Sequence, residues 1–234
     1  MAIRRTQLVN DEIYHVILRS VGDTVIFNDE NDFYRGIFSL YEFNSMNPVN
    51  IWLRRRQRKK EKEGEALRSP TSQSLEKRQK IILVEILAFC FMPNHIHLLL
   101  KQKKDNGISQ FMQKVGTGYA NYFNKKYSRK GHLFSRFRSV HVKTDEQLRN
   151  VFAYIHVNAL SLIEPGWKEI GIKNLKKAIK FLEQEYRWSS FFDFLGVKNF
   201  PSVTNRDFLL ETVGGENGCK EIIKNWLINK KKFE

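Results

Sequence analysis

The stretch that decides the fold is "IILVEILAFCFMPNHIHLLLK", residues 81–101. It contains two apolar runs on either side of Pro93-Asn94, a dipeptide typical of turns because proline fixes φ and asparagine tolerates the left-handed conformation. The sequence therefore predicts a hairpin of two central strands, 81–92 and 95–101.

The second strand of this hairpin carries two histidines one residue apart. Side chains two positions apart on a strand point to the same face, so His95 and His97 project together, while Ile96, Leu98 and Leu100 face the other way. Two adjacent imidazoles can supply two ligands to one divalent ion. The alternative is a pair of core histidines, each hydrogen-bonded to backbone. Cupin-like and structural metal sites also use such pairs, so the pair alone does not identify the chemistry.

The rest of the chain alternates between strand-like and helix-like patterns. Thr144, with Gln147 three residues on, is a capping-box signature for a helix start. The order of elements predicts an α+β fold, an antiparallel sheet flanked by helices. Its further strands are expected at 12–20 and 132–142, and its helices at 29–44, 108–127, 144–160 and 174–186.

Charge points to a polyanionic partner. The chain carries 40 Lys+Arg against 25 Asp+Glu, a net +15. Residues 50–80 alone hold 11 basic and 4 acidic side chains. The remaining residues of this segment include too few apolar side chains to form a hydrophobic core. We interpret this segment as a flexible basic insertion or a partly helical arm. Nucleic acid is the expected partner, because neutralised phosphates release counterions; a solvated lysine-rich surface is the alternative.

Membrane and secretory classes are not indicated. No apolar run approaches the ~20 residues of a membrane span, and the N-terminal residues lack the apolar stretch of a secretory signal. Cys90 and Cys219 form neither a disulfide framework nor a metal-binding spacing. We therefore expect a cytoplasmic protein with no membrane partner.

A second candidate site lies on the predicted helix 144–160. Tyr154 and Asn158 are four residues apart and lie on one helix face. A phenol is a potential nucleophile, but with an ordinary pKa of about 10 it needs a nearby cation or base. The Asn158 carbonyl oxygen could complete an oxygen-rich metal site. Alternatively, Tyr154 is an interfacial aromatic residue and Asn158 a helix cap.

Basic side chains offer a candidate DNA-binding surface. Arg136 and Arg138 are expected on one strand face together with Phe134, which suits a phosphate clamp with a stacking surface for single-stranded nucleic acid; they could equally pair with surface acids. His15 and Arg19 share a face of the first strand. We expect Arg19 to join the other two arginines in binding DNA, although both residues could be structural.

Five segments together resemble a known family. The segments "IYHVILRS", "FCFMPNHIHLLL", "ANYFNKKYSRKGHLFSRFRS", "YIHVNAL" and "YRWSSF" occur in this order. They resemble the REP-associated tyrosine transposases, a branch of the single-tyrosine HUH transposases of bacterial insertion sequences. The resemblance runs from about residue 12 to 195, interrupted at 50–80 and 163–185.

This resemblance implies roles for four residues. His95 and His97 match the pair that binds the catalytic Mg²⁺ or Mn²⁺, with Asn158 as a third ligand. Tyr154 matches the nucleophile that attacks single-stranded DNA, leaving a 5′-phosphotyrosine and a free 3′-OH. The implied fold is ferredoxin-like, the implied substrates are DNA hairpins, and the implied assembly is a monomer or homodimer. The family's Asn-Pro is Asn158-Ala159 here, so the helix could continue to about Leu162.

The sequence thus predicts a transposase-like domain at 1–195, including the basic 50–80 insertion, and a helical C-terminal extension at 196–234. The expected activity is metal-dependent cleavage and rejoining of single-stranded, hairpin-containing DNA. One alternative is a domesticated, non-catalytic protein that binds DNA hairpins. Another is a metal-dependent nuclease that uses the histidine pair without a covalent intermediate at Tyr154.

Overall fold

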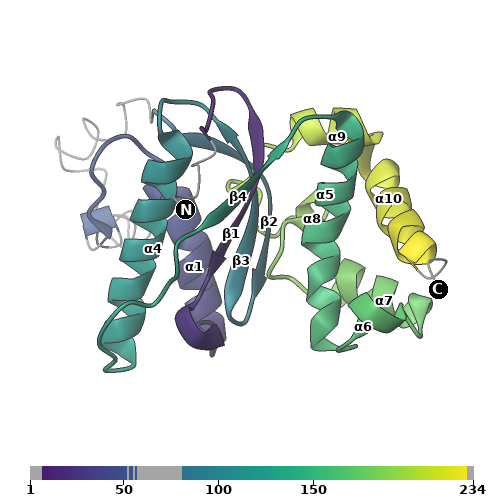
Figure 1. Cartoon of the computed structure of the whole chain (residues 1–234), viewed down its shortest axis with the longest axis horizontal. Helices are drawn as coiled ribbons and strands as arrows, with labels where there is room; N and C mark the ends of the chain where they lie inside the picture. Colours follow the sequence, from purple (N-terminus) through teal and green to yellow (C-terminus); the bar gives the residue numbers. More distant parts are fainter. Residues whose placement is uncertain (1–6, 52, 55, 57–80, 231–234) are drawn as a thin grey trace, which may run out of the picture.

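The computed structural model describes residues 7–51, 53–54, 56 and 81–230, and Figure 1 gives the arrangement of its elements. Most of the predicted 50–80 insertion lies outside these residues. The strands are β1 (Ile13–Arg19), β2 (Val84–Met92), β3 (His95–Gln102) and β4 (Arg138–Val142). The helices are α1 (Glu30–Phe43), α4 (Gly107–Lys126), α5 (Asp145–Val157), α6 (Trp167–Ile170), α7 (Leu175–Lys180), α8 (Phe191–Phe194), α9 (Asp207–Val213) and α10 (Gly215–Lys230).

The four strands form one antiparallel sheet in the order β2-β3-β1-β4. Combined with the chain order β1-α1-β2-β3-α4-β4, this is the ferredoxin-like arrangement. The predicted fold class is therefore confirmed. The hairpin is confirmed as well, since Met92 pairs directly with His95 across the Pro93-Asn94 turn.

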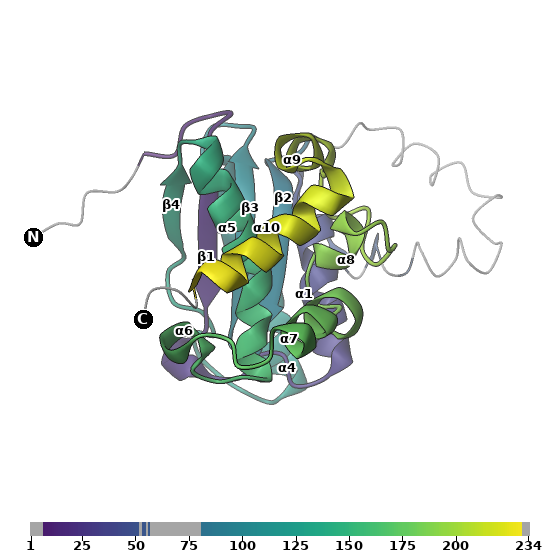
Figure 2. The ribbon, with the colours of Figure 1, turned by 90° about the vertical axis from the view of Figure 1, so that its right-hand side faces the viewer.

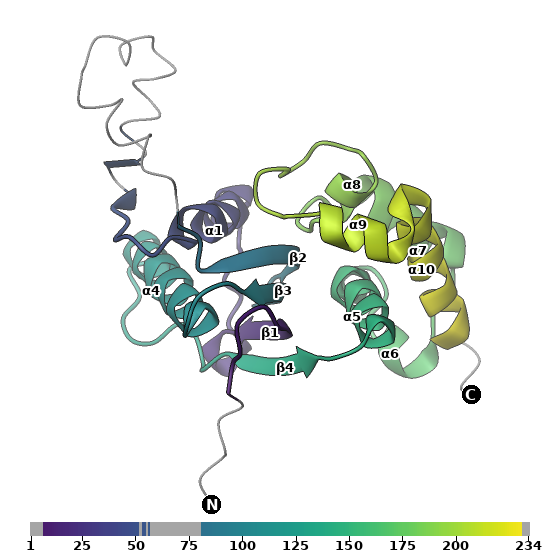
Figure 3. The ribbon, with the colours of Figure 1, turned by 90° about the horizontal axis from the view of Figure 1, so that it is seen from above.

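Helices cover both faces of the sheet. Helices α1 and α4 lie on one side, and α5 with the later helices lies on the other (Figures 1 and 3). Residues Ile96, Leu98 and Leu100 belong to the core under α1 and α4, whereas Leu99 belongs to the core under α5. The alternation along β3 is therefore as predicted, and it places both histidines on the α5 side.

Helix α5 begins at the predicted cap. The Thr144 hydroxyl accepts the Gln147 N–H at 3.2 Å, and the Gln147 side chain accepts the Lys143 N–H at 2.8 Å. Beyond Val157 the chain continues as a 3₁₀ helix over Asn158–Leu162, which fits the expectation drawn from Ala159. Alanine retains the backbone N–H and the free φ that a proline would remove.

The C-terminal helices share the core of α5. Helix α10 crosses α5 on the side away from the sheet (Figure 2). Its buried residues Cys219, Ile223 and Leu227 belong to the same apolar cluster as Phe152 of α5. The helix that carries Tyr154 is therefore packed between the sheet and the chain's C-terminal segment.

Two element boundaries differ from the prediction. The strand expected over 132–142 begins only at Arg138, because the regular ladder with β1 stops at the Ile17–Arg138 pair, two residues before β1 ends; Phe134 forms an isolated, register-shifted bridge with Ser20. The helix expected over 174–186 is α-helical over Leu175–Lys180 and continues as one π-helical turn over Phe181–Glu185. Among the described residues, no helix has the length and apolar character needed to cross a membrane.

Candidate functional site

The paired histidines lie at the start of β3, on the sheet face that α5 covers. Their ring centroids are 4.9 Å apart with the rings at 75°. The His97 side chain is 3% exposed and His95 is half-buried. The hairpin turn and the period of the strand are thus sufficient to aim both imidazoles at one region.

A polar chain orients His95. Its Nδ1 lies 2.6 Å from Asn94 Oδ1, and the Asn94 amide donates in turn to Asp23 Oδ1 at 3.3 Å. Asp23 also accepts from Arg19 Nε at 2.9 Å. Since a carbonyl oxygen only accepts, His95 carries its proton on Nδ1, and the Nε2 lone pair remains for another partner.

His97 is paired with a third histidine, His15 of β1. The distance from His15 Nε2 to His97 Nδ1 is 2.9 Å, and the two rings stack at 5.2 Å between centroids. The tautomer that donates from His97 Nδ1 to His15 leaves the His97 Nε2 lone pair free. His15 is 8% exposed, so this contact is shielded from water.

All three imidazoles are held neutral. Burial lowers the pKa of His15 and of His95 to about 4 and that of His97 to about 2. For His95, the positive charges of Arg19 and Lys168 lower the pKa further. For His97, the neighbouring His95 and His15 lower the pKa further, and Lys168 and Arg19 add a smaller effect. Neutral imidazoles are the form that binds metal ions.

Tyr154 completes this group from the opposite layer. It is half-buried on α5, and its ring centroid lies 5.6 Å from that of His97 and 5.7 Å from that of His15, both edge-on. Residues more than fifty positions apart in sequence therefore come together where α5 packs over the sheet. The predicted nucleophile and the predicted metal ligands share one site.

Asn158 has a partner that the sequence did not suggest. Its Nδ2 donates to the Tyr154 carbonyl at 2.6 Å, and its Oδ1 accepts from Lys168 Nζ at 2.7 Å. The side chain is 1% exposed. The amide oxygen proposed as a metal ligand is thus bound to an ammonium group, which also lies 5.3 Å from the Tyr154 ring centroid.

The three predicted DNA-binding arginines separate into two groups. Arg19 pairs with His95 and Arg138 pairs with Ile17, which in turn pairs with His97, so both arginines lie on the histidine face of the sheet. Arg136 precedes β4 and lines cavities beside Ser109 of α4. The structure does not bring Arg136 and Arg138 to one face, because the strand alternation does not reach residue 136.

The donor set fits a divalent cation. In His95 and His97 the Nδ1 atom is engaged by a neighbouring side chain, the arrangement by which proteins orient metal-binding imidazoles. Within the described part of the chain, no cluster of three or more His, Cys, Asp or Glu side chains suited to a metal is found. Further ligands would therefore come from an amide oxygen, substrate or water.

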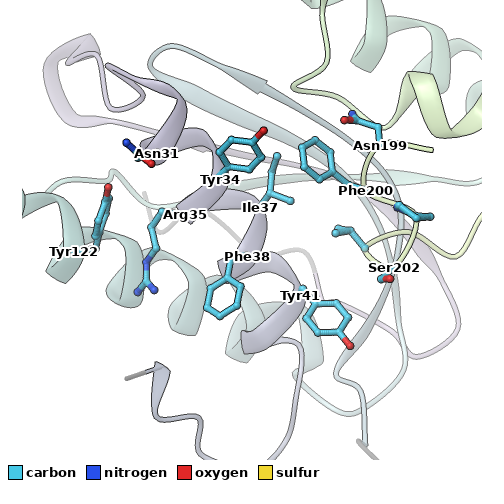
Figure 4. Close-up of a pocket in the computed structure, with 12 residues that line it drawn as sticks. Asn31, Tyr34, Arg35, Ile37, Phe38, Tyr41, Tyr122, Asn199, Phe200 and Ser202 are labelled. Atoms are coloured by element: carbon cyan, nitrogen blue, oxygen red, sulfur yellow. The ribbon is translucent and has the colours of Figure 1, made fainter. Parts of the chain in front are cut away.

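A separate cavity of about 660 Å³ lies between α1 and the loop 199–203. Figure 4 shows the side chains that line it, including Tyr34 and Phe200, whose ring centroids are 6.2 Å apart. None of the candidate site residues lines this cavity. The candidate catalytic residues therefore lie on the histidine face of the sheet and not in this aromatic cavity.

Sequence reasoning left out several residues of the site. His15 was available from the alternation of the first strand, but only the register with β3 brings it to His97. Asn94 was noted for its turn and not for its side chain. Lys168 directly follows the segment 164–167, "EPGW", whose proline and glycine are typical of a chain break, and it gives no local signal because its position depends on how the chain folds back after α5.

Comparison with known proteins finds a matching family model. The family model described as "Transposase IS200 like" matches residues 45–158, a range that contains both paired histidines, Tyr154 and Asn158. The matched range is just under half of the chain, and the resemblance to a transposase family expected from the sequence motifs is confirmed. The match begins after β1 and ends before Lys168. No curated protein sequence matches the chain.

Three solved structures are similar at low identity. A REP-associated tyrosine transposase bound to a REP hairpin is 13% identical, with 88% of this chain and 93% of that chain covered and a TM-score of 0.48. A bacterial tRNA(His) guanylyltransferase-like protein is 11% identical in its ATP complex (77% and 71% covered, TM-score 0.38). Its GTP complex is 10% identical (85% and 93% covered, TM-score 0.39). At these scores none of the three supports an argument about activity.

Proposed function

We propose that this protein cleaves and rejoins single-stranded DNA carrying hairpins, with Tyr154 as the nucleophile and His95 and His97 as ligands of Mg²⁺ or Mn²⁺. The observation that carries the proposal is the approach of the Tyr154 ring to within 5.6 Å of the His97 ring, between centroids. The match to the IS200-like transposase family model supports the reaction class, and the net charge of +15 supports DNA as the partner.

The proposed reaction is a transesterification. The Tyr154 oxygen forms a bond to phosphorus while the bond from phosphorus to the 3′-oxygen breaks; the phenolic proton passes to solvent, and the leaving oxygen takes up a proton to become a 3′-OH. Attack by a 3′-OH on the phosphotyrosine reverses these steps and rejoins a strand without ATP. A divalent ion bound to the histidines would supply Lewis-acid polarisation of the phosphate.

The residues around the nucleophile would each serve this chemistry. The neutral imidazoles of His95 and His97 keep their lone pairs available at physiological pH, because burial lowers the pKa of each to about 4 and about 2. Arg19 and Arg138 lie on the same face of the sheet and would bind the DNA backbone. We infer hairpin substrates and a cytoplasmic location from the resemblance of the sequence motifs.

A trapping experiment tests this function. The protein is incubated with Mn²⁺ and a labelled library of single-stranded hairpins with randomised flanks, and a denaturation-resistant protein–DNA adduct is sought. Wild type should form the adduct, and Tyr154→Phe should bind the DNA but form none. Tyr34→Phe, which removes a hydroxyl from the α1 side of the sheet, is the matched control and should behave as wild type. His97→Ala should abolish the adduct.

Other outcomes point to the alternatives. If wild type cleaves without an adduct and Tyr154→Phe cleaves equally well, the protein is a metal-dependent nuclease and the tyrosine mechanism is wrong. If wild type binds hairpins tightly but neither cleaves nor forms an adduct, it is a non-catalytic hairpin-binding protein.

A further inference from the structure

Lys168 is the second residue of α6, a single helical turn that is anchored firmly. The neighbouring Trp167 is 1% exposed, and its indole donates to Ser161 Oγ at 2.9 Å. The Lys168 ammonium donates to Asn158 Oδ1 at 2.7 Å and lies 5.3 Å from the centroid of the Tyr154 ring. A rigid support thus holds a cation beside the proposed nucleophile.

The hydrogen-bond partner of this ammonium is uncharged. Within the described residues, no carboxylate forms an ion pair with Lys168; its hydrogen-bond acceptor is the uncharged amide of Asn158. The residue is exposed, so its long side chain can turn to another acceptor without disturbing the core. An unpaired cation next to a nucleophile is a natural binding point for the anionic group that the nucleophile attacks.

We propose that Lys168 is a catalytic residue that binds the scissile phosphate: Asn158 holds its ammonium beside Tyr154 in the free protein, and the ammonium transfers to a non-bridging phosphate oxygen when DNA binds. The proposal rests on the proposed function. It adds a residue from outside the family match, which ends at Asn158. Lys168 then supplies positive charge where negative charge develops during attack by Tyr154.

The same geometry sets Lys168 against the metal ion. A divalent cation at the histidine pair is repelled by a nearby ammonium, and the Asn158 oxygen is engaged by Lys168 while DNA is absent. Lys168 should therefore weaken the binding of the metal alone and strengthen the reaction with DNA. These two effects have opposite signs, which a merely structural lysine would not produce.

The test compares Lys168→Met with Lys168→Arg and with Lys176→Met, an exposed lysine of α7. Mn²⁺ alone is titrated into each full-length protein, and free Mn²⁺ is followed by electron paramagnetic resonance. The dissociation constant of Lys168→Met should fall about threefold to tenfold. The Lys168→Arg variant should stay close to wild type, because it keeps the charge, and Lys176→Met should not change.

Adduct formation is then measured in a single turnover at saturating Mn²⁺ and hairpin DNA. We expect Lys168→Met to slow it about tenfold to a hundredfold, with partial recovery in Lys168→Arg and none of this loss in Lys176→Met. Metal binding and adduct formation that weaken together would reveal a structural role and overturn the proposal, as would no change in either.

The two proposals fail in different ways. If wild type forms no adduct with any hairpin, the proposed cleavage is wrong. The role of Lys168 in phosphate binding is then tested by the affinity of the protein for hairpin DNA. The dissociation constant for hairpin DNA, measured by fluorescence anisotropy, should then rise about threefold to tenfold in Lys168→Met. An equal dissociation constant for wild type and variant would overturn phosphate binding by Lys168.

Discussion

Buried His156 links α5, the helix of Tyr154, to the sheet. Its Nδ1 donates to the Phe152 carbonyl at 2.9 Å, and its Nε2 lies 2.9 Å from Ser190 Oγ. Ser190 Oγ also accepts the Phe89 N–H of β2 at 3.0 Å. With Nδ1 donating to a carbonyl, the neutral imidazole accepts the serine hydroxyl at Nε2, in competition with the Phe89 carbonyl, which lies 3.2 Å from the same hydroxyl oxygen. Burial lowers the pKa of His156 from 6.5 to about 3.

This shift makes the stability of the protein depend on pH. The unfolded chain takes up the proton near pH 6.5 and the folded chain only near pH 3, so the unfolded state binds more protons between these values. The free energy of unfolding is therefore fully retained above about pH 6.5 and falls as the pH drops. At pH 5, a difference of 1.5 pH units corresponds to about 2 kcal/mol from this one residue.

The perturbation is His156→Gln, which keeps hydrogen-bonding groups but does not titrate. Urea unfolding followed by circular dichroism at pH 7.5 and pH 5.0 gives the free energy of unfolding of each protein. At pH 7.5 the variant should be less stable by roughly 1–3 kcal/mol, because glutamine cannot reproduce both contacts. At pH 5.0 this difference should narrow by about 2 kcal/mol.

The control is His132→Gln, which replaces an exposed imidazole and should keep the same difference from wild type at both pH values. A gap between wild type and His156→Gln that is equal at pH 7.5 and pH 5.0 would refute the reasoning. It would mean that His156 does not resist protonation in the folded protein, and that the link to Ser190 is looser than the distances indicate.

Two further predictions concern helix packing and the orientation of His97. A Cβ added at Gly118 of α4 would overlap the Phe43 ring of α1, so Gly118→Ala should lower the free energy of unfolding by about 1–3 kcal/mol. The control Gly116→Ala should not lower it, because its Cβ would meet Phe134 at an ordinary 3.9 Å. Equal melting temperatures of the two variants would contradict the packing argument. Since His15 contacts His97 Nδ1, His15→Leu should weaken Mn²⁺ binding about tenfold with partial recovery in His15→Gln; unchanged Mn²⁺ titrations would show that His97 is oriented without it.

The parts of the fold that follow local rules were predictable. The period of two along β3 correctly assigned His95 and His97 to one face and the intervening Ile96 to the other. The hydroxyl of Thr144 and the amide of Gln147 correctly marked the start of α5. These rules need only the chain's own geometry and neighbours within one turn.

The parts that depend on distant contacts were not predictable. The alternation of residues 132–137 resembles a strand, but its regular pairing with β1 stops at the Ile17–Arg138 pair, and only an isolated bridge from Phe134 to Ser20 follows. The contact between Lys168 and Asn158 depends on the path of the chain through the 3₁₀ helix and into α6. An exposed lysine has no period or cap that indicates where its ammonium will lie.

The single-residue spacing along β3 also limits how the gene can change. One codon inserted or deleted inside this strand would shift every later side chain to the opposite face, turning buried leucines toward α5 and a histidine into the apolar layer under α1 and α4. A point substitution changes one side chain of the strand, whereas a length change alters the face of every later one. Segments that vary in length must therefore enter between elements, as the basic stretch 50–80 does between α1 and β2.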